Sequence, residues 1–270
     1  MDPGSGDRAH TEMLWKLARD KRMKSRLTAA QSPEVSRDIL EFLAADEAPA
    51  VRRTVAAWDS PQATDLLRTL RGDPDLKTRQ AVVANPHCSP DILRELVNDP
   101  HPSVRWAIPP HPHADISVRR AIIASRDSTL RRLLAESAEL EPEIAHVLMD
   151  DDSREVKESL AAHTTLPDVL TALAAHTDPK IRAGAAQNPR TTPEQRHALA
   201  RDPAALVRAN LLKFVELAEE DLRLLANDRS INVRWWLATW PTTPVGILEI
   251  LAQDSHPEVA DQAAAALARR

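Results

Sequence analysis

The segment Asn85–Pro112, with the sequence NPHCSPDILRELVNDPHPSVRWAIPPHP, decides the fold of this chain. Its pattern predicts a first helix that begins near Pro90, a turn at Asp99, and a second, short helix around Arg105. Proline is tolerated in the first turn of a helix, whereas a proline further along ends the helix. The segment therefore predicts a pair of short helices separated by a tight turn.

The same unit recurs along the chain with a period of 25–27 residues. We use the step Val104-Arg105 as the anchor that marks each unit. The anchor positions are occupied by Arg26, Arg52, Arg79, Arg105, Arg131, Lys157, Arg182, Arg208, Arg234 and Ala260. Ten units therefore fill the chain from about residue 11 onward. Two short helices cannot bury their apolar faces alone, so neighbouring units must stack into a continuous core.

Aspartates recur in register with the anchors, six residues before most of them. A helical wheel places the anchor arginine at the packed face, where an unpaired guanidinium is costly, so the aspartate six residues earlier is its predicted partner. These residues recur in nearly every unit, whereas a catalytic group is needed only once. We therefore predict a structural arginine–aspartate ladder, which includes Asp46, Arg52, Asp73, Arg79, Asp99, Arg105, Asp202, Arg208, Asp228 and Arg234.

The repeat follows the pattern L-x-x-L-x-x-D-x-x-x-x-V-R-x-x-V-A-x-N-P-x-x-x-P, which is nearly complete from Leu93 to Arg105 and from Ile181 to Pro189. This pattern resembles the leucine-rich repeat variant family and, more loosely, the HEAT-like helical repeats. The resemblance covers essentially the whole chain. It implies an all-α, right-handed superhelical solenoid of stacked helix pairs, in which the second helix is short or 3₁₀-like. One member type carries an N-terminal iron–sulfur module with several cysteines, which this chain lacks.

Composition and charge exclude several other classes of protein. The net charge of −5 offers no basic excess for nucleic acid or an anionic membrane. A single cysteine, Cys88, excludes an internal disulfide. The polar residues 1–10 predict a flexible N-terminal tail without a signal segment, and no apolar run is long enough to cross a bilayer. We therefore expect a cytoplasmic protein without membrane contact, in which residues 11–270 form one solenoid whose terminal units act as caps.

The outward positions of the second helices predict where a partner binds. In HEAT-like solenoids these helices line the concave face. The charges there are three basic and three acidic, namely Arg53, Arg132, Lys213, Glu136, Glu158 and Asp261. A face that is neutral and carries tryptophans favours a protein or peptide ligand, because exposed aromatic residues are typical interface anchors. Packing between neighbouring helices is the alternative role of the tryptophans. The predicted partner-binding residues are Trp106, Trp235, Trp236, Arg53 and Arg132.

The predicted function is a non-enzymatic scaffold for a protein or peptide. We predict no catalytic residue, no metal site and no cofactor; the histidines near Cys88 are interpreted as turn residues, since stacked helices hold them too far apart to share one ion. The alternative is a HEAT-like nucleic-acid-binding protein or a DNA glycosylase-type enzyme, because some of these use Trp, Asp and Arg on such a face. The neutral face counts against it. A third possibility is a subunit that stacks end to end, and the sequence leaves the oligomeric state open.

Overall fold

Helices alone build the regular structure of this chain in the computed structural model, which describes residues 4–137, 139–214 and 216–270. Within these ranges twenty α-helices follow one another, and they form ten successive pairs of a first helix and a second helix. This arrangement confirms the predicted all-α helical-repeat solenoid with about ten two-helix repeats.

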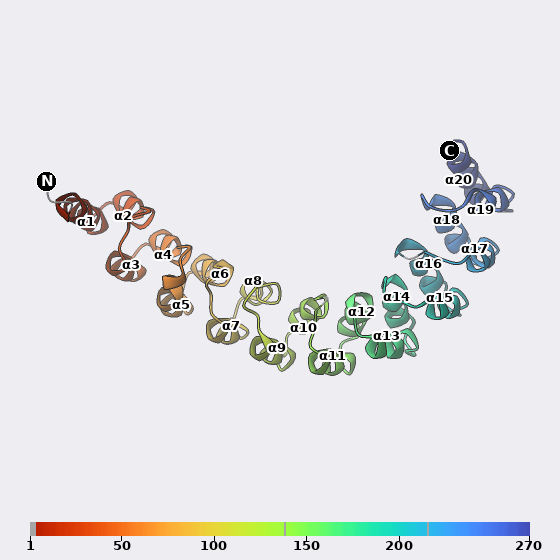
Figure 1. Cartoon of the computed structure of the whole chain (residues 1–270), viewed down its shortest axis with the longest axis horizontal. Helices are drawn as coiled ribbons and strands as arrows, with labels where there is room; N and C mark the ends of the chain where they lie inside the picture. The colour runs from red at the N-terminus through yellow and green to blue at the C-terminus, as the bar shows by residue number, and fades with distance from the viewer. Residues whose placement is uncertain (1–3, 138, 215) are drawn as a thin grey trace. The chain divides into compact units, whose positions relative to one another are not determined.

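The helices group into two compact units, Met1–Arg126 and Asp127–Arg270, which we call unit 1 and unit 2. In unit 1 the odd-numbered first helices form one layer and the even-numbered second helices form the other (Figure 1). The first helices are α1 (Gly4–Ala18), α3 (Arg37–Ala44), α5 (Thr64–Leu70), α7 (Pro90–Leu96) and α9 (Ile116–Ile123). The second helices are α2 (Met23–Ala30), α4 (Pro49–Ala56), α6 (Leu76–Ala84) and α8 (Pro102–Arg105).

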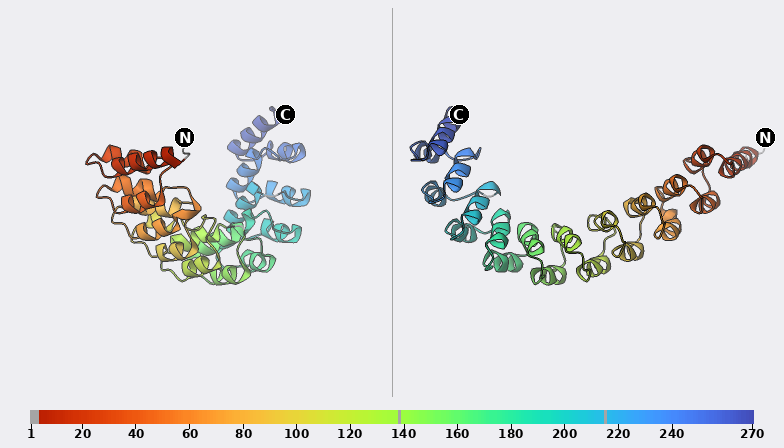
Figure 2. Two further views of the ribbon diagram at one scale, coloured as in Figure 1. Left: turned by 60° about the vertical axis from the view of Figure 1, so that its left-hand side comes forward. Right: turned by 180° about the vertical axis from the view of Figure 1, so that it is seen from behind.

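Unit 2 repeats the two-layer arrangement, which Figure 2 shows from two further directions. Its first helices are α11 (Pro142–Met149), α13 (Pro167–Ala174), α15 (Pro193–Ala200), α17 (Glu219–Ala226) and α19 (Val245–Leu251). Its second helices are α10 (Ser128–Ala135), α12 (Arg154–His163), α14 (Pro179–Gln187), α16 (Ala205–Phe214), α18 (Ile231–Thr239) and α20 (Pro257–Leu267). The single array that the sequence predicts over residues 11–270 stays a prediction.

Helix α1 begins earlier than the sequence suggested. The predicted tail covered residues 1–10, but α1 already includes residues from Gly4 onward. No proline follows Pro3 in this stretch, so each later residue can donate the backbone N–H that a helical hydrogen bond requires. Residues 1–3 lie outside the described ranges. Because α1 begins at Gly4, the first helix starts within the segment that was predicted as a tail.

The second helices are α-helical in the described part of the chain, and they range from four residues in α8 to eleven in α20. The second helices were expected to be short or 3₁₀-like, and they are short α-helices, of which α8 is the shortest. Helix α8 ends early because Pro109 and Pro110 follow it closely and provide no backbone N–H for a helical hydrogen bond. The described 3₁₀ segment, Pro61–Ala63, precedes the first helix α5 instead.

The core lies between the two layers and contains apolar residues that recur at fixed positions beside the anchors. Val104 and Ile108, which lie one residue before and three residues after the anchor Arg105, are completely buried. In unit 2 the equivalent positions of several repeats join one hydrophobic cluster. Its members at these positions include Val207, Leu211, Val233, Leu237, Val259 and Ala263. The apolar faces of the short helices are thus buried by stacking of neighbouring repeats.

Candidate binding surface on the second helices

The ladder arginines bind the aspartate of the following repeat, and this corrects the pairing predicted from the sequence. Arg208 donates from Nε and Nη2 to the carboxylate of Asp228, at 2.5 and 2.7 Å, and both side chains are buried. The aspartate six residues before it, Asp202, binds Arg182 of the preceding repeat instead. The pairs of this kind are Arg26–Asp46, Arg52–Asp73, Arg79–Asp99, Arg131–Asp151, Arg182–Asp202, Arg208–Asp228 and Arg234–Asp254.

The aspartate six residues earlier still contributes to the ladder, but through its backbone. Nη1 of Arg208 donates to the carbonyl oxygen of Asp202 at 2.6 Å. The carboxylate of Asp228 also accepts a hydrogen bond from the backbone N–H of Ser230 at 2.7 Å. Each guanidinium therefore connects the turn of its own repeat to the turn of the next one. These polar groups hold the stack together, and their bonding capacity is used within the chain.

The ladder departs from this scheme at Arg105 in unit 1, at the first and last anchor repeats, and in unit 2, where Lys157 replaces an arginine and His176 the next aspartate. Arg105 donates to the carbonyl of Asp99 at 2.8 Å, but serine rather than aspartate occupies position 125, twenty residues further on. At the first rung, Asp20 has no arginine from an earlier repeat, and Arg22 of its own turn binds its carboxylate at 2.9 and 3.1 Å. At the last anchor position Ala260 replaces the arginine.

Acid should weaken the ladder, and Asp254 provides the test. The Arg234 guanidinium lowers the pKa of the Asp254 carboxyl despite the opposing effect of burial. The pKa of this carboxyl is thus lower in the folded chain than its unfolded value of about 4. The ionised carboxylate stabilises the fold at pH values above the unfolded pKa, and this stabilisation is lost as the pH falls through the folded pKa. Asp254→Asn should cost about 1.5–3 kcal/mol at pH 7, the range for hydrogen bonds to charged groups. Urea unfolding from pH 7 to pH 2 should show the two proteins converging in acid; a constant difference would contradict this.

Two buried asparagines form a second set of contacts between repeats that the sequence analysis did not predict. The side-chain amide of Asn188 donates to the carbonyls of Ala161 and Thr164, both at 2.9 Å, and its oxygen accepts from the N–H of Arg190 at 2.9 Å. Asn85 makes the equivalent contacts to Ala56, Trp58 and His87. The Asn-Pro pair at a fixed distance from the anchor is the sequence signal for this contact.

The predicted tryptophans lie on second helices or at their ends. Trp106 follows α8 and is 41% exposed, and Trp236 in α18 is 36% exposed. Trp235 is half-buried and packs against the core of unit 2, so packing accounts for part of its role. The rings of Trp235 and Trp236 contact each other edge to face, with centroids 5.2 Å apart. Trp106 belongs to unit 1, whereas this pair belongs to unit 2.

The two predicted basic contact residues are engaged by carboxylates of this chain. Arg53 lies 3.1 Å from Asp75, and Arg132 pairs with Glu136 one turn later in the sequence. Each guanidinium remains more than a third exposed. Beside Arg132 a shallow cavity of about 310 Å³ opens on α10, α12 and α14, and Glu158 and Gly184 are among its lining residues. The two arginines are thus partly neutralised already, which weakens their case as phosphate ligands.

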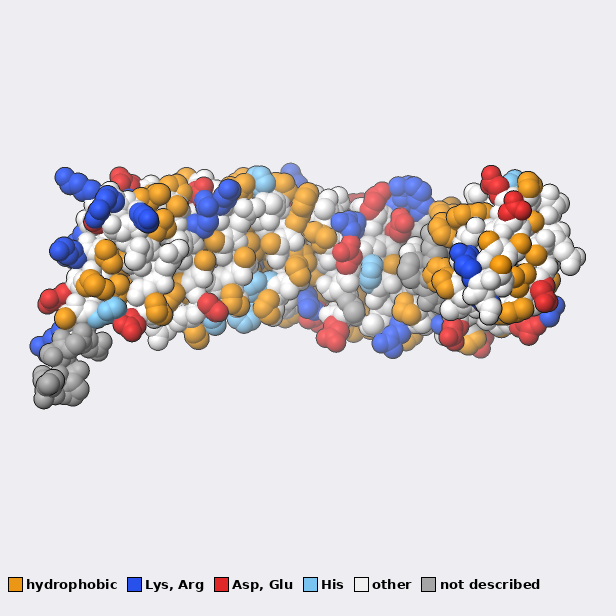
Figure 3. Space-filling view, turned by 90° about the horizontal axis from the view of Figure 1, so that it is seen from above, with side chains coloured by type: hydrophobic (Ala, Val, Ile, Leu, Met, Phe, Trp, Pro, Cys, Tyr) orange, Lys and Arg blue, Asp and Glu red, His pale blue; other side chains and the backbone are white. Residues whose placement is uncertain are grey.

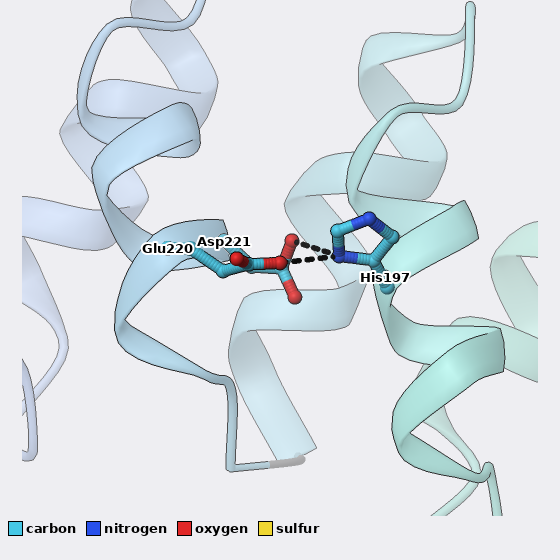
Figure 4. A group of neighbouring side chains, drawn as sticks. All are labelled: His197, Glu220 and Asp221. Carbon is cyan, nitrogen blue, oxygen red and sulfur yellow. Dashed lines mark ion pairs between the residues drawn. The ribbon is translucent and has the colours of Figure 1, made fainter.

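A cluster on the first helices of unit 2 has ligand types that suit a metal ion. Nδ1 of His197 lies 2.9 Å from Glu220 and 3.0 Å from Asp221, as Figure 4 shows. However, Arg201 donates to the buried Asp221 at 2.7 Å and also lies 3.0 Å from Nδ1 of His197. An ion would have to displace this guanidinium, so we interpret the cluster as an ion-pair contact between α15 and α17.

Cys88, the one cysteine, has the properties of a core residue. It is fully buried, and this burial raises the pKa of its thiol to about 12. A thiolate rather than a thiol is the nucleophile in cysteine chemistry. The side chains of the neighbouring His111 and His113 contact the backbone carbonyls of Asn85 and Cys88, at 3.0 and 3.1 Å. These contacts agree with the interpretation of the histidines as turn residues.

The exposed face of the second helices mixes apolar and polar side chains. Figure 3 views the chain from above and shows hydrophobic side chains interspersed with charged and other polar ones. No described helix combines the length and apolar character that a bilayer-spanning segment requires.

Comparisons with known proteins give a likeness only among solved structures. No family model matches the chain, and no curated protein matches it. Among solved structures, it is similar to one described as "a leucine-rich repeat variant with a novel repetitive protein structural motif", with 20% identity over 87% of this chain and 85% of that chain, at a TM-score of 0.47. That solved structure belongs, by its description, to the repeat class that the sequence motif of this chain resembles.

Proposed function

We propose that this chain is a non-enzymatic scaffold that binds a protein or peptide through its second-helix layers. The observation that carries the proposal is the exposure of Trp106 and Trp236, at 41% and 36%, on or beside second helices. Exposed tryptophans are costly in water, and they are among the residues that dominate binding energy at protein interfaces. We infer that these side chains complete their burial against a partner.

The use of the repeated polar residues supports a role without catalysis. The ladder aspartates and arginines bind each other and the backbone turns, and the thiol of Cys88 is buried. The proposal includes a cytoplasmic location, in keeping with a chain that has one cysteine and so no internal disulfide. Nucleic acid fits less well, because the guanidinium groups of Arg53 and Arg132 are each paired with a carboxylate.

Photo-crosslinking in the organism that encodes the protein tests the proposal. The photoreactive residue p-benzoylphenylalanine is introduced in place of Trp106 or Trp236, one position per variant. If the second helices bind a partner, irradiation should produce a discrete higher-mass adduct of a protein or peptide, since the reactive ring then lies in the interface. Mass spectrometry of the adduct identifies the partner.

Matched control positions lie on the opposite layer. Val147 in α11 and Leu224 in α17 are 51% and 40% exposed, so they are as accessible as the tryptophans but belong to first helices. They should give no adduct, or different and diffuse ones. The proposal fails if the tryptophan positions yield no specific adduct, or if all four positions yield the same one.

A further inference from the structure

Exposed apolar and acidic side chains form a surface on the second helices at the C-terminal end of unit 2, where α18 packs against both α16 and α20. We call it the C-terminal aromatic surface, and it consists of side chains from α16, α18 and α20. Its residues are Leu206, Ile231, Trp235, Trp236, Glu258 and Asp261. Leu206 in α16 and Ile231 in α18 are 47% and 41% exposed, so both helices carry exposed apolar side chains in addition to Trp236.

The two tryptophans have different roles in this surface. Trp235 packs against the core of unit 2, and its edge-to-face contact with Trp236 supports the second ring. Trp236 is the more exposed of the two. An aromatic ring that is held in place loses little conformational freedom when a ligand contacts it. Trp236 is therefore suited to act as a rigid platform.

The carboxylates of this surface lack a cation in the part of the chain that the structure describes. Glu258 and Asp261 are exposed on α20, and neither has a described ion pair or side-chain hydrogen bond. Helix α20 contains no lysine or arginine between Pro257 and Leu267. The nearest cation after it in the sequence, Arg269, lies eight residues beyond Asp261, about 12 Å along a helix axis. At the ends of two other second helices, by contrast, the carboxylate of Glu136 is paired with Arg132 and that of Asp75 with Arg53.

Unit 2 as a whole is negatively charged, as the carboxylates of the C-terminal aromatic surface are. Unit 2 contains 16 Lys and Arg against 23 Asp and Glu, a net charge of −7, whereas unit 1 contains 19 against 17, a net charge of +2. The net charge of −5 for the chain thus conceals an acidic C-terminal unit. A negative field of this kind attracts cationic partners and repels nucleic acid and anionic membranes.

We infer that the C-terminal aromatic surface binds a basic peptide segment that also carries apolar residues. The apolar residues pack on Leu206, Ile231 and Trp236. Lysine or arginine side chains pair with Glu258 and Asp261 and lie over the Trp236 ring, whose electron-rich face attracts a cation. The chain already contains such a contact, because the guanidinium of Arg19 lies over the Trp15 ring, 4.4 Å from its centroid. This inference rests on the proposed function and specifies the chemistry of the partner.

The test begins with a phage library of random twelve-residue peptides, selected on the full chain. The enriched sequences should combine lysine or arginine with large apolar residues. A fluorescein-labelled synthetic copy of the most enriched peptide is then titrated with the protein and followed by anisotropy. The double variant Glu258→Gln/Asp261→Asn should weaken binding about fivefold to tenfold at low salt, and Trp236→Ala about tenfold or more.

A control variant removes the same charge from the other layer. Glu12 in α1 and Glu249 in α19 are exposed and belong to first helices, so Glu12→Gln/Glu249→Gln should leave the affinity within about twofold of the parent. The inference is overturned if the enriched peptides have no basic bias, or if both double variants weaken binding equally. Those outcomes leave the scaffold function standing. A selection that enriches no peptide would also overturn the inference. The scaffold proposal would fail as well only if the photo-crosslinking variants yield no specific adduct.

Discussion

Arg208→Ala is expected to lower the free energy of unfolding by about 3–5 kcal/mol, the usual cost of breaking a buried ion pair by removing one partner. The side chains of Arg208 and Asp228 are 6% and 5% exposed, so the remaining carboxylate would stay buried without its cation. The carbonyl of Asp202 would also lose its hydrogen bond from Nη1. Urea denaturation followed by circular dichroism measures the loss.

The control for this prediction is an exposed pair in the same unit. Arg223 binds Glu219 on α17, and both side chains are more than half exposed. Arg223→Ala should therefore change stability by no more than about 0.5 kcal/mol, as exposed pairs contribute little. A similar loss in both variants would show that the ladder is no more important than a surface ion pair.

Double-mutant cycles distinguish the observed pairing from the one that the sequence suggested. Arg208→Ala and Asp228→Ala should show a coupling energy of about 1–3 kcal/mol, because the two side chains contact each other. The coupling between Arg208→Ala and Asp202→Ala should be smaller, since Arg208 contacts only the backbone of Asp202, which alanine retains. A larger coupling energy for Arg208→Ala with Asp202→Ala than with Asp228→Ala would instead support the pairing within one repeat that the sequence suggested.

Gly184→Ala is expected to destabilise the chain by about 1–3 kcal/mol, as overpacking of a tight contact usually does. A Cβ atom at Gly184 in α14 would overlap the backbone oxygen of Glu158 in α12 and approach the Cβ atom of Ala161 to 3.2 Å. Backbone atoms cannot move aside as a flexible side chain can, so the two helices would have to separate. The direction is opposite to that of helix propensity, which favours alanine over glycine by about 1 kcal/mol.

Gly246 in α19 supplies the matched control, because an added Cβ would meet no atom within 4 Å. Gly246→Ala should stabilise the protein by about 0.5–1 kcal/mol through helix propensity alone. Thermal unfolding of the two variants should thus shift the melting temperature in opposite directions. A stabilising effect of Gly184→Ala would show that α12 and α14 pack less closely than the structure indicates.

Periodicity made the helix pairs, their number and their core predictable. The residues beside each anchor, such as Val104 and Ile108, repeat at fixed positions, and a helical wheel is enough to assign them to the packed face. The ladder partner was misassigned because the wheel describes one helix at a time. Whether Arg208 reaches Asp202 or Asp228 depends on how neighbouring repeats stack, which a single repeat does not contain.

The remaining differences also arise from contacts beyond one repeat. Gly184 occupies an outward position on the wheel, yet it is buried, because α14 packs closely against α12 and α16. Asn188 was recognisable as a recurring residue, but its bonds to Ala161 and Thr164 depend on the preceding repeat. The sequence placed Trp106 and Trp236 at outward positions, and both are exposed. It did not show that Arg53 and Arg132 are already paired with carboxylates of this chain.

The ladder has a direction along the chain. Each complete repeat contributes an arginine to the following repeat and an aspartate to the preceding one. At the start the carboxylate of Asp20 is already occupied by Arg22, and at the end Ala260 offers no cation. A repeat duplicated between two complete rungs, such as Arg182–Asp202 and Arg208–Asp228, would therefore find a matching partner on each side. Gene duplication at such a place can lengthen the array without breaking the ladder.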